Sequence, residues 1–386
     1  MSWIDLLCCF LSFGGDRLAT PTGLALKRTA LNGLHKALGA KMVEFGGWEM
    51  PVEYSGIIQE HLAVRRAAGL FDVSHMGEVK VCGPRALSLL QNVTSNDVSR
   101  LEDFQAQYSA LMHPKGSAVD DCVVHRLAKD YYFLCVNAAN TERDFDWIVQ
   151  HNNVGAEVRN VSGEYAQLAL QGPRAPEIIS KVTETSIAEL KYYWFCRIRC
   201  CGVEGLLART GYTGEDGFEF YFPAGESEKV WKTLMEAGQT EGLVPAGLGA
   251  RNTLRLEAGY PLYGHELDED TTLLEANLGW IAKLEKGEFI GRDVLLEQRA
   301  RGVHKKLMGF EMTGLGIARD GYKVYIGGQV AGVVTSGSYA PLLKKNISMA
   351  YISSAQAEIG REIQVEIRGR LAGARIVPLP FYKRLR

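Results

Sequence analysis

An acidic segment bordered by glycines, at residues 211–219, has the composition of a ligand site. It reads Gly-Tyr-Thr-Gly-Glu-Asp-Gly-Phe-Glu, so a further carboxylate, Glu219, follows the acidic turn. Glycines allow a backbone to approach a ligand closely. We expect strands at 205–209 and 218–222 to flank the turn. Alternation in the second strand then places its three phenylalanines on one face and Glu219 on the other.

The three acids of this segment differ in how well they fit a ligand-binding role. Glu215 and Asp216 fit a hairpin turn in which both are solvated, and we prefer that interpretation. Glu219 is harder to explain this way, because strands are depleted in acidic residues unless one face is wet or occupied. Glu219 is therefore the stronger candidate for binding.

A second candidate site lies at 113–125, with the sequence His-Pro-Lys-Gly-Ser-Ala-Val-Asp-Asp-Cys-Val-Val-His. A turn followed by two acids ahead of an apolar strand puts Asp120 and Asp121 on opposite faces. One of them could point inward to orient a reacting nitrogen or stabilise a developing cation. A solvated turn acid is an equally good interpretation from the residues alone.

A third candidate is the glycine-rich start of a helix at 246–259, whose N-terminus could favour an anion. Arg251 and Arg255 lie four residues apart and share a face, so either could pair with Glu219, with Glu257 or with a ligand. An ordinary ion pair and a ligand contact are equally good interpretations of Arg251. His75, within Phe-Asp-Val-Ser-His-Met-Gly, is the candidate catalytic histidine, although a structural histidine is the more common case.

The elements that would position these residues alternate between short strands and helices. The predicted helices lie at 31–38, 57–68, 84–91, 140–150, 175–181 and 226–237. Beyond 286, short strands separated by glycine-bearing turns predict a small barrel or sandwich. The pattern favours α+β sandwich units over a parallel doubly wound sheet.

Composition limits the classes of function. A chain of 386 residues exceeds a single core, so we expect two or three domains. A formal charge of −2 and the absence of a basic block argue against nucleic-acid and membrane-surface partners. The eight cysteines lack zinc-like spacing, so no metal site is predicted and a reducing compartment is favoured.

The first 25 residues are expected to be an extension outside the fold. Residues 3–13 are apolar, but they lack a basic flank and are too short to span a bilayer. The segment is also poor in arginine, unlike a mitochondrial presequence. Together with the ending Pro-Phe-Tyr-Lys-Arg at 380–384, this makes us expect a cytoplasmic bacterial protein, with the mitochondrial matrix as the location if the source is eukaryotic.

Residues 27–384 resemble the aminomethyltransferases, or T-proteins, of the glycine cleavage system. Individually weak motifs carry the resemblance together: Lys-Met-Val-Glu-Phe-Gly-Gly-Trp-Glu-Met-Pro-Val at 41–52, Phe-Asp-Val-Ser-His-Met-Gly at 71–77, the Asp-Asp pair, 211–219, Arg-Asn-Thr-Leu-Arg-Leu-Glu-Ala-Gly at 251–259, Val-Thr-Ser-Gly-Ser at 334–338, Leu-Lys-Lys-Asn at 343–346 and Pro-Phe-Tyr-Lys-Arg at 380–384.

The resemblance implies a three-domain cloverleaf of class α+β, with two interwoven α/β-sandwich domains and a C-terminal β-barrel around a central opening. The expected first domain comprises 26–52 and 140–245, and the second comprises 53–139 and 246–285. The barrel would occupy 286–386.

The resemblance also implies the reaction. The family takes an aminomethyl group from the lipoyl arm of H-protein, releases ammonia and forms 5,10-methylenetetrahydrofolate. Tetrahydrofolate is a co-substrate bound in the opening, and neither a metal nor a flavin is needed. Lipoylated H-protein is the implied partner.

Family motifs assign site residues by position. Asp121 matches the essential acid, which would hold the folate nitrogens in attacking geometry and stabilise the cationic transfer state. Glu219 matches the acid that accepts the pterin N–H groups. The other matched folate or substrate contacts are Arg251, Tyr212, Asn137, Trp280, Tyr382 and Arg384. For Trp280, a place in the core is an equal alternative.

Two other classes share this fold. A folate-dependent demethylating oxidase would carry an added flavin domain, for which the chain has no room. A non-catalytic folate-binding paralogue of the iron–sulfur repair type would carry a Lys-Gly-Cys motif, which is replaced here by 211–219. We keep this paralogue as the alternative and prefer the enzyme because Asp121 is present.

Overall fold

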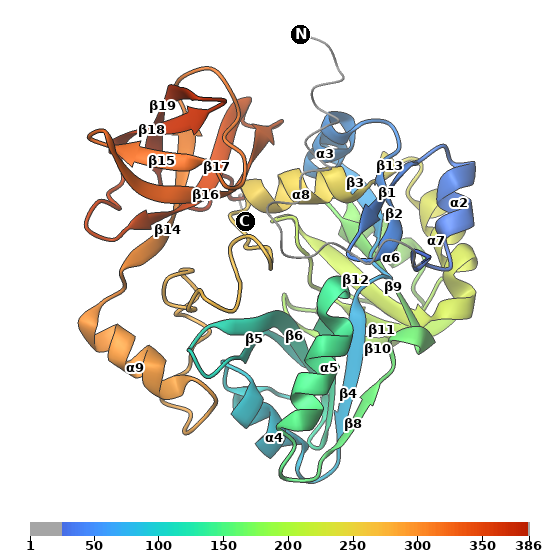
Figure 1. Cartoon of the computed structure of the whole chain (residues 1–386). Coiled ribbons are helices and arrows are strands. Elements are labelled where there is room, and N and C mark those ends of the chain that lie inside the picture. Colours follow the sequence, from blue (N-terminus) through green and yellow to red (C-terminus); the bar gives the residue numbers. More distant parts are fainter. Residues whose placement is uncertain (1–24, 385–386) are drawn as a thin grey trace.

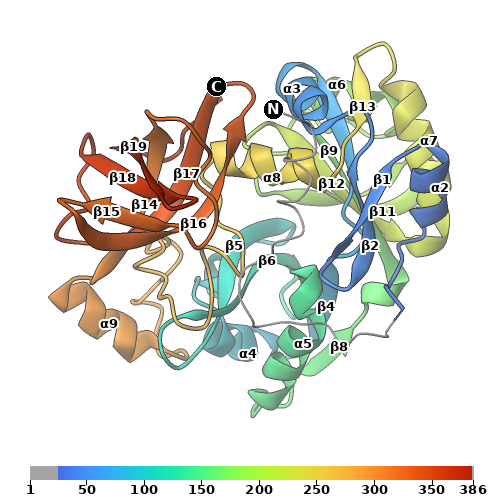
Figure 2. The same ribbon diagram turned by 45° about the horizontal axis from the view of Figure 1, so that its top comes forward.

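The structure is a computed structural model that describes residues 25–384. The extension predicted at 1–25 therefore lies outside the described residues, except for Ala25. Three lobes surround a common centre, and α8 (Leu248–Glu257) lies between the barrel and the largest sheet in both views (Figures 1 and 2). Each lobe is built on one sheet. The α+β class and the C-terminal barrel predicted from the sequence are confirmed.

The first lobe contains a six-stranded sheet that is antiparallel except at its β3–β13 edge. In spatial order its strands are β10 (Phe195–Cys200), β11 (Val203–Ala208), β12 (Gly217–Pro223), β9 (Tyr165–Gln171), β3 (Ala68–Asp72) and β13 (Leu243–Pro245). The predicted hairpin around the acidic turn is therefore β11 and β12, which pair antiparallel.

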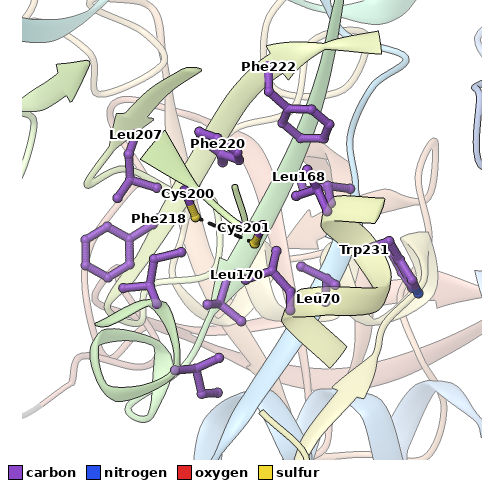
Figure 3. Close-up of a cluster of buried hydrophobic side chains, with 14 of the residues drawn as sticks. Leu70, Leu168, Leu170, Cys200, Cys201, Leu207, Phe218, Phe220, Phe222 and Trp231 are labelled. Atoms are coloured by element: carbon purple, nitrogen blue, oxygen red, sulfur yellow. Dashed lines mark hydrogen bonds between the residues drawn. The ribbon is translucent and has the colours of Figure 1, made fainter. Parts of the chain in front are cut away.

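The core of this lobe lies on one face of the sheet. Phe218, Phe220 and Phe222 are buried there together with Trp231 (Figure 3). Trp231 belongs to α7 (Ser227–Ala237), which packs beside α6 (Ala175–Lys181) over the sheet. The alternation predicted for 218–222 is confirmed, because Glu219 and Tyr221 face the opposite side.

The second lobe contains a five-stranded antiparallel sheet. Its strands, in spatial order, are β5 (Gln105–Met112), β6 (Ala118–Ala128), β7 (Tyr131–Val136), β4 (Gly77–Cys82) and β8 (Glu157–Asn160). Two helices, α4 (Ala86–Val93) and α5 (Thr141–Gln150), bury their apolar residues against it. Asp120 and Asp121 lie at the start of β6, beside its partners β5 and β7.

The two sheets pack face to face through a second apolar layer that includes Phe133, Phe195 and Tyr221. His125 fits among these three rings, with ring centroids 5.2 to 5.8 Å apart. Both faces of β12 are therefore covered, which explains why Glu219 is buried although it points away from the phenylalanines.

The domain ranges expected from the sequence remain a prediction. The strands show how closely the chain interweaves. Strand β3, from the range 53–139, lies in the six-stranded sheet, and β8, from the range 140–245, lies in the five-stranded sheet. A hairpin of β1 (Lys41–Phe45) and β2 (Trp48–Glu53) precedes them both.

The third lobe is a closed barrel that follows α9 (Arg292–Arg301). Its strands, in spatial order, are β14 (Lys305–Met312), β17 (Lys345–Ser353), β16 (Gln329–Ala340), β15 (Lys323–Ile326), β18 (Glu362–Ile367) and β19 (Arg370–Val377). Helix α8 packs on β16 and on α3 (Ile57–Arg66), and so connects the barrel to the first lobe.

The remaining elements are short and lie in the connections. They are α2 (Asn32–Ala37) and four 3₁₀ turns, η1 (Val98–Arg100), η2 (Ala138–Asn140), η3 (Ser162–Glu164) and η4 (Ala224–Glu226). All six helices predicted from the sequence are present, with ends shifted by no more than a few residues.

Candidate active site

Asp121 is held by two neutral donors from neighbouring strands and turns. Tyr108 of β5 donates its hydroxyl to Oδ2 at 2.9 Å, and the Asn137 side-chain amide donates to Oδ1 at 2.8 Å. Asp120, on the opposite face of β6, is fully buried. The two carboxylates therefore have different environments: Asp120 is the inward acid, and Asp121 remains partly exposed.

The environment of Asp121 shifts its ionisation towards neutral pH. Burial and, after it, the negative charge of Asp120 raise the pKa of Asp121 to about 7, although the bonds from Tyr108 and Asn137 oppose the shift. A carboxyl that titrates near the working pH can both accept a proton and stabilise a cation.

Glu219 is a buried carboxylate bonded to side chains that carry no charge. Gln167 of β9 donates its amide to Oε1 at 3.0 Å, and the Thr210 hydroxyl donates to Oε2 at 2.5 Å. Within residues 25–384 no cation forms an ion pair with it. Each carboxylate oxygen can accept a further hydrogen bond, so Glu219 keeps the capacity to bind a ligand that presents N–H groups.

The glycines of the acidic turn make room for a protein side chain. A Cβ on Gly211 would come within 1.9 Å of the Gln171 amide oxygen, and one on Gly217 within 2.4 Å of its nitrogen. Gln171 in turn accepts a bond from Thr213 and donates to the carbonyl of Thr210. These two glycines are thus explained by Gln171, and the expected close approach to a ligand is not needed to account for them.

The interpretation of Glu215 and Asp216 as solvated turn residues is wrong. Glu215 pairs with Arg65 at 2.9 Å, and Asp216 pairs with Arg209 at 2.6 Å. The Glu215 carboxylate is only 5% exposed. The tertiary fold brings both arginines to the turn, and the turn sequence alone gave no sign of Arg65.

The two arginines of α8 have different surroundings. Arg255 is buried and pairs with Glu266 at 2.9 Å, while it also donates to the Ser336 hydroxyl of the barrel. Arg251 forms no ion pair among the described residues, and its guanidinium lies over the Tyr212 ring at 4.8 Å. A half-buried cation without a carboxylate partner favours the ligand interpretation of Arg251 over the ordinary ion pair.

The N-terminus of α8 already has an anion. The Glu60 carboxylate, buried in α3, accepts a hydrogen bond of 2.9 Å from the backbone N–H of Gly247. A Cβ at Gly247 would come within 2.4 Å of the Val52 carbonyl group, so the glycine allows α8 to lie against β2. A protein carboxylate thus occupies the anion position suggested by the sequence.

A group of tyrosines connects Asp121 with Glu219. Tyr193 lies within electrostatic range of both acids, and its pKa is raised well above the usual value, first by burial, then by Tyr192 and Tyr260, and after these by Glu219 and Asp121. Tyr212 donates its hydroxyl to the Pro261 carbonyl, and its ring lies 5.8 Å from that of Tyr260. Burial raises the pKa of Tyr212, and among the smaller effects Asp121 raises it while Arg251 lowers it. The structure therefore brings Asp121, Glu219, Arg251 and Tyr212 into one region.

Trp280 lies on the surface of this region. Its side chain is 58% exposed and stacks on Tyr108 with ring centroids 6.0 Å apart. A place in the core is thereby excluded. Tyr108 also bonds to Asp121, so it contacts both the exposed Trp280 ring and the candidate catalytic acid.

A cavity of about 450 Å³ lies beside the acidic turn. Its walls are formed by Tyr192, Arg209, Gly214, Glu215, Ala258, Tyr260, Pro380, Tyr382, Lys383 and Arg384. The ring of Tyr382 lies against the Arg65 guanidinium at 4.1 Å, and Arg384 is 3.6 Å from Asp216. The end of the chain is thus part of the cavity wall, and the size is ordinary for a small-molecule site.

His75 is unsuited to proton transfer near neutral pH. It is buried, and burial together with the charge of Arg251 lowers its pKa to about 4. Its Nδ1 has no hydrogen-bond partner among the described residues. The imidazole is therefore neutral under ordinary conditions, and its ring edge packs on Phe45.

Three residues that support this site were missed from the sequence: Tyr108, Gln167 and Thr210. The register of the β5–β6 hairpin could have indicated Tyr108, since Ala110 pairs with Asp121 and Tyr108 is two residues further along. Gln167 lies 52 residues from Glu219 along the chain, and no local pattern connects the two.

In residues 25–384, no three His, Cys, Asp or Glu side chains gather closely enough to hold a metal ion. Among the helices described by the structure, none has the length and apolar character required to cross a bilayer.

Two family models match the chain. The model described as the GCVT N-terminal domain matches residues 31–286, which include Asp121, Glu219 and Arg251. The model described as the glycine cleavage T-protein C-terminal barrel domain matches residues 305–383, which form the barrel and the segment after it.

Individual relatives agree with these matches over nearly the whole chain. The chain is 51% identical to an aminomethyltransferase of Acidobacterium capsulatum, over 95% of this chain and 99% of that protein. It is 52% identical to an aminomethyltransferase of Moorella thermoacetica, with coverage of 93% and 98%. A crystal structure of the glycine cleavage system aminomethyltransferase T from Bartonella henselae is similar with a TM-score of 0.87 at 33% identity, covering 93% of this chain and 99% of that one.

Proposed function

Because the chain belongs to the aminomethyltransferase family, the T-proteins of the glycine cleavage system, we propose that Asp121 carries out its aminomethyl transfer to tetrahydrofolate. The protein is a transferase. The aminomethyl group arrives on the lipoyl arm of H-protein, ammonia leaves, and 5,10-methylenetetrahydrofolate and the dihydrolipoyl arm are formed.

The observation that carries the assignment of Asp121 is its environment. Tyr108 and Asn137 fix both carboxylate oxygens, and burial beside Asp120 raises the pKa of Asp121 to about 7. A fixed carboxylate of this kind orients an attacking nitrogen and stabilises the positive charge that develops as ammonia departs. Because both donors are neutral, the negative charge of Asp121 is not cancelled by a protein cation.

Glu219 is proposed to bind the pterin ring of tetrahydrofolate. Its carboxylate is buried and has neutral partners, so it can accept bonds from the ring amide N–H and the exocyclic amine side by side. Arg251 is proposed to bind the folate through its positively charged guanidinium, since it has no carboxylate partner within the described residues. Tyr212 lies under its guanidinium and keeps it in place.

The remaining predicted contacts lie around these groups. Asn137 orients Asp121 through its side-chain amide. Trp280 offers a ring face beside Tyr108. Tyr382 and Arg384 line the cavity of about 450 Å³. We propose that the folate tail or the lipoyl arm passes this cavity wall. The chemistry described needs neither a metal nor a flavin, and the proposed location is the cytoplasm of a bacterium.

The experiment is single-turnover ammonia release from aminomethyl-loaded H-protein, with and without tetrahydrofolate, for wild type and Asp121→Asn. Release that requires both folate and Asp121 supports the assignment. Wild-type turnover in a folded Asp121→Asn variant would remove Asp121 from the chemistry. Folate binding without release by the wild type would instead fit the non-catalytic paralogue, which no finding at present favours.

A further inference from the structure

A second buried acid lies behind the Asp120–Asp121 pair. Asp144 projects from α5, and both Asp144 and Asp120 have 0% exposure. Neither carboxylate oxygen of Asp144 has a hydrogen-bond donor among the described residues. The nearest cation is Arg143, whose Nε is 3.8 Å from Oδ1, too far for a hydrogen bond. That guanidinium donates instead to the Val119 carbonyl.

Asp120 accepts hydrogen bonds on both of its oxygens. The backbone N–H of Asn137 donates to Oδ2 at 3.1 Å, and its side-chain amide donates to Oδ1 at 2.8 Å. These donors stabilise Asp120 as an anion. A second anion in contact with it, buried and without donors, would be very costly. The geometry therefore leaves the proton of the pair on Asp144.

Electrostatics agree with this reading of the geometry. Burial and, after it, the charge of Asp120 raise the pKa of Asp144 to about 11. At neutral pH Asp144 is consequently a carboxylic acid, with one hydroxyl to donate.

We propose that Asp144 is a neutral acid that donates its proton in a hydrogen bond to Asp120, and that it thereby acts as a positioning residue for Asp121. The connection runs from Asp144 to Asp120, through the Asn137 amide, to Asp121. The inference rests on the proposed function, because it takes Asp121 as the reacting carboxylate. Asp144 itself does not contact substrate.

This connection has a chemical consequence for Asp121. A donor from Asp144 adds to the Asn137 bonds that stabilise the negative charge of Asp120, and this charge is the second cause, after burial, of the raised pKa of Asp121. If the donor is removed, the negative charge of Asp120 loses one of its hydrogen-bond donors, and the proton of the Asp120–Asp121 pair is shared differently. The pKa of Asp121 then falls, so Asp144 indirectly sets the pH at which Asp121 ionises.

Three other titratable groups beside the cluster have pKa values above the range of the test. Burial raises the pKa of Cys122 on β6 and of Tyr108 on β5 well above their usual values, and that of Tyr263 to about 12. Arg143, on α5 itself, also lies 3.5 Å from the Glu269 carboxylate.

The strands packed under α5 add no charge to this cluster. Strand β4 turns Val79 and Val81 towards Ile148 of α5, and β8 contributes Val158 to the same apolar layer. Their charged residues alternate to the other face, where Lys80 pairs with Glu164. A shift in the pH profile of ammonia release can therefore be attributed to Asp120, Asp121 and Asp144.

The kinetic test compares two substitutions of Asp144. Asp144→Asn keeps the size and an N–H donor towards Asp120, whereas Asp144→Leu removes the donor. Asp146→Leu, at an exposed position of the same helix, is the matched control. Ammonia release is measured against pH, together with KM for tetrahydrofolate, and circular dichroism and thermal unfolding confirm that each variant is folded.

We expect Asp144→Leu to lower kcat on the order of 10²-fold, as loss of alignment does, with little change in KM. The acid limb of its pH profile should lie at lower pH than that of the wild type. Asp144→Asn and the control should keep the wild-type limb and most of kcat. Wild-type kcat in Asp144→Leu, an unmoved limb, or an equal loss in Asp144→Asn would each overturn the proposal.

An independent readout does not depend on activity. The infrared difference spectrum between wild type and Asp144→Asn at about pH 8 should contain the carbonyl stretch of a protonated carboxylic acid. Its absence would overturn the neutral state of Asp144, whatever the kinetics show. A wild type without folate-dependent ammonia release would refute the proposed function instead, while this spectrum would still decide the state of the acid pair. This measurement also covers the case in which Asp144→Leu does not fold.

Discussion

The side-chain amide of Asn137 donates a hydrogen bond of 2.8 Å to Oδ1 of Asp121. The same nitrogen donates to Asp120, so one residue in the turn after β7 fixes both acids of β6. Asn137 was expected to contact the ligand, and this geometry gives it the additional task of orienting the candidate catalytic carboxylate.

Removal of the Asn137 amide should impair the chemical step. We expect Asn137→Ala to lower kcat by about 10- to 100-fold, because a misaligned carboxylate loses most of its catalytic advantage. Single-turnover ammonia release measures the effect. Asn140→Ala is a suitable control, since the Asn140 side chain does not cap α5 and lies in the same turn. Equal rates for Asn137→Ala and the control would show that Asp121 does not depend on this bond.

The rate should rise with pH through the ionisation of Asp121. Its pKa is raised to about 7, and the ionised form is the one proposed to act, so activity is lost as the pH falls below that value. Tyr108→Phe removes a hydrogen bond that favours the charged form, and its acid limb should therefore move to higher pH. Tyr325→Phe, which removes a hydroxyl bonded to Glu366 in the barrel, should leave the limb in place. A downward shift for Tyr108→Phe would contradict the assignment of this limb to Asp121.

Loss of the Arg251 charge should weaken folate binding. Hydrogen bonds to charged groups contribute about 1.5–3 kcal/mol, so Arg251→Gln should raise the Kd for tetrahydrofolate by roughly 10- to 100-fold. Isothermal titration calorimetry under anaerobic conditions measures it. Arg174→Gln, which affects an exposed pair with Glu177, provides the comparison. An unchanged Kd for Arg251→Gln would show that this arginine does not bind tetrahydrofolate.

Arg255, one turn further along α8, should matter for stability. Its buried pair with Glu266 and its bond to Ser336 connect the helix to the barrel. Arg255→Met leaves the Glu266 charge buried and unpaired, which should cost about 3–5 kcal/mol in the free energy of unfolding. Urea unfolding gives the value, and Arg375→Met at the exposed pair with Glu362 should change it by less than about 1 kcal/mol. Similar losses in the two variants would contradict the buried-pair argument.

Much of the fold could be predicted from periodicity. The alternation at 218–222 identified which residues of β12 face the helices, and glycine-bearing turns after 286 indicated the barrel. The motifs of the family placed Asp121, Glu219 and Arg251 in one site. Local patterns failed at Glu215 and Asp216, because their arginine partners depend on how distant segments pack.

The sequence by itself determined which residue types stand at the start of β6, in β12 and on α8, and which face of each element they occupy. Only the tertiary structure decided their partners. The Asn137 amide reaches Asp121 across 16 residues, and the Gln167 amide reaches Glu219 across 52. Such contacts arise from strand pairing and sheet packing, which local propensities do not encode. The same packing buries both Asp144 and Asp120 completely, and burial disfavours the charged form of a carboxyl group.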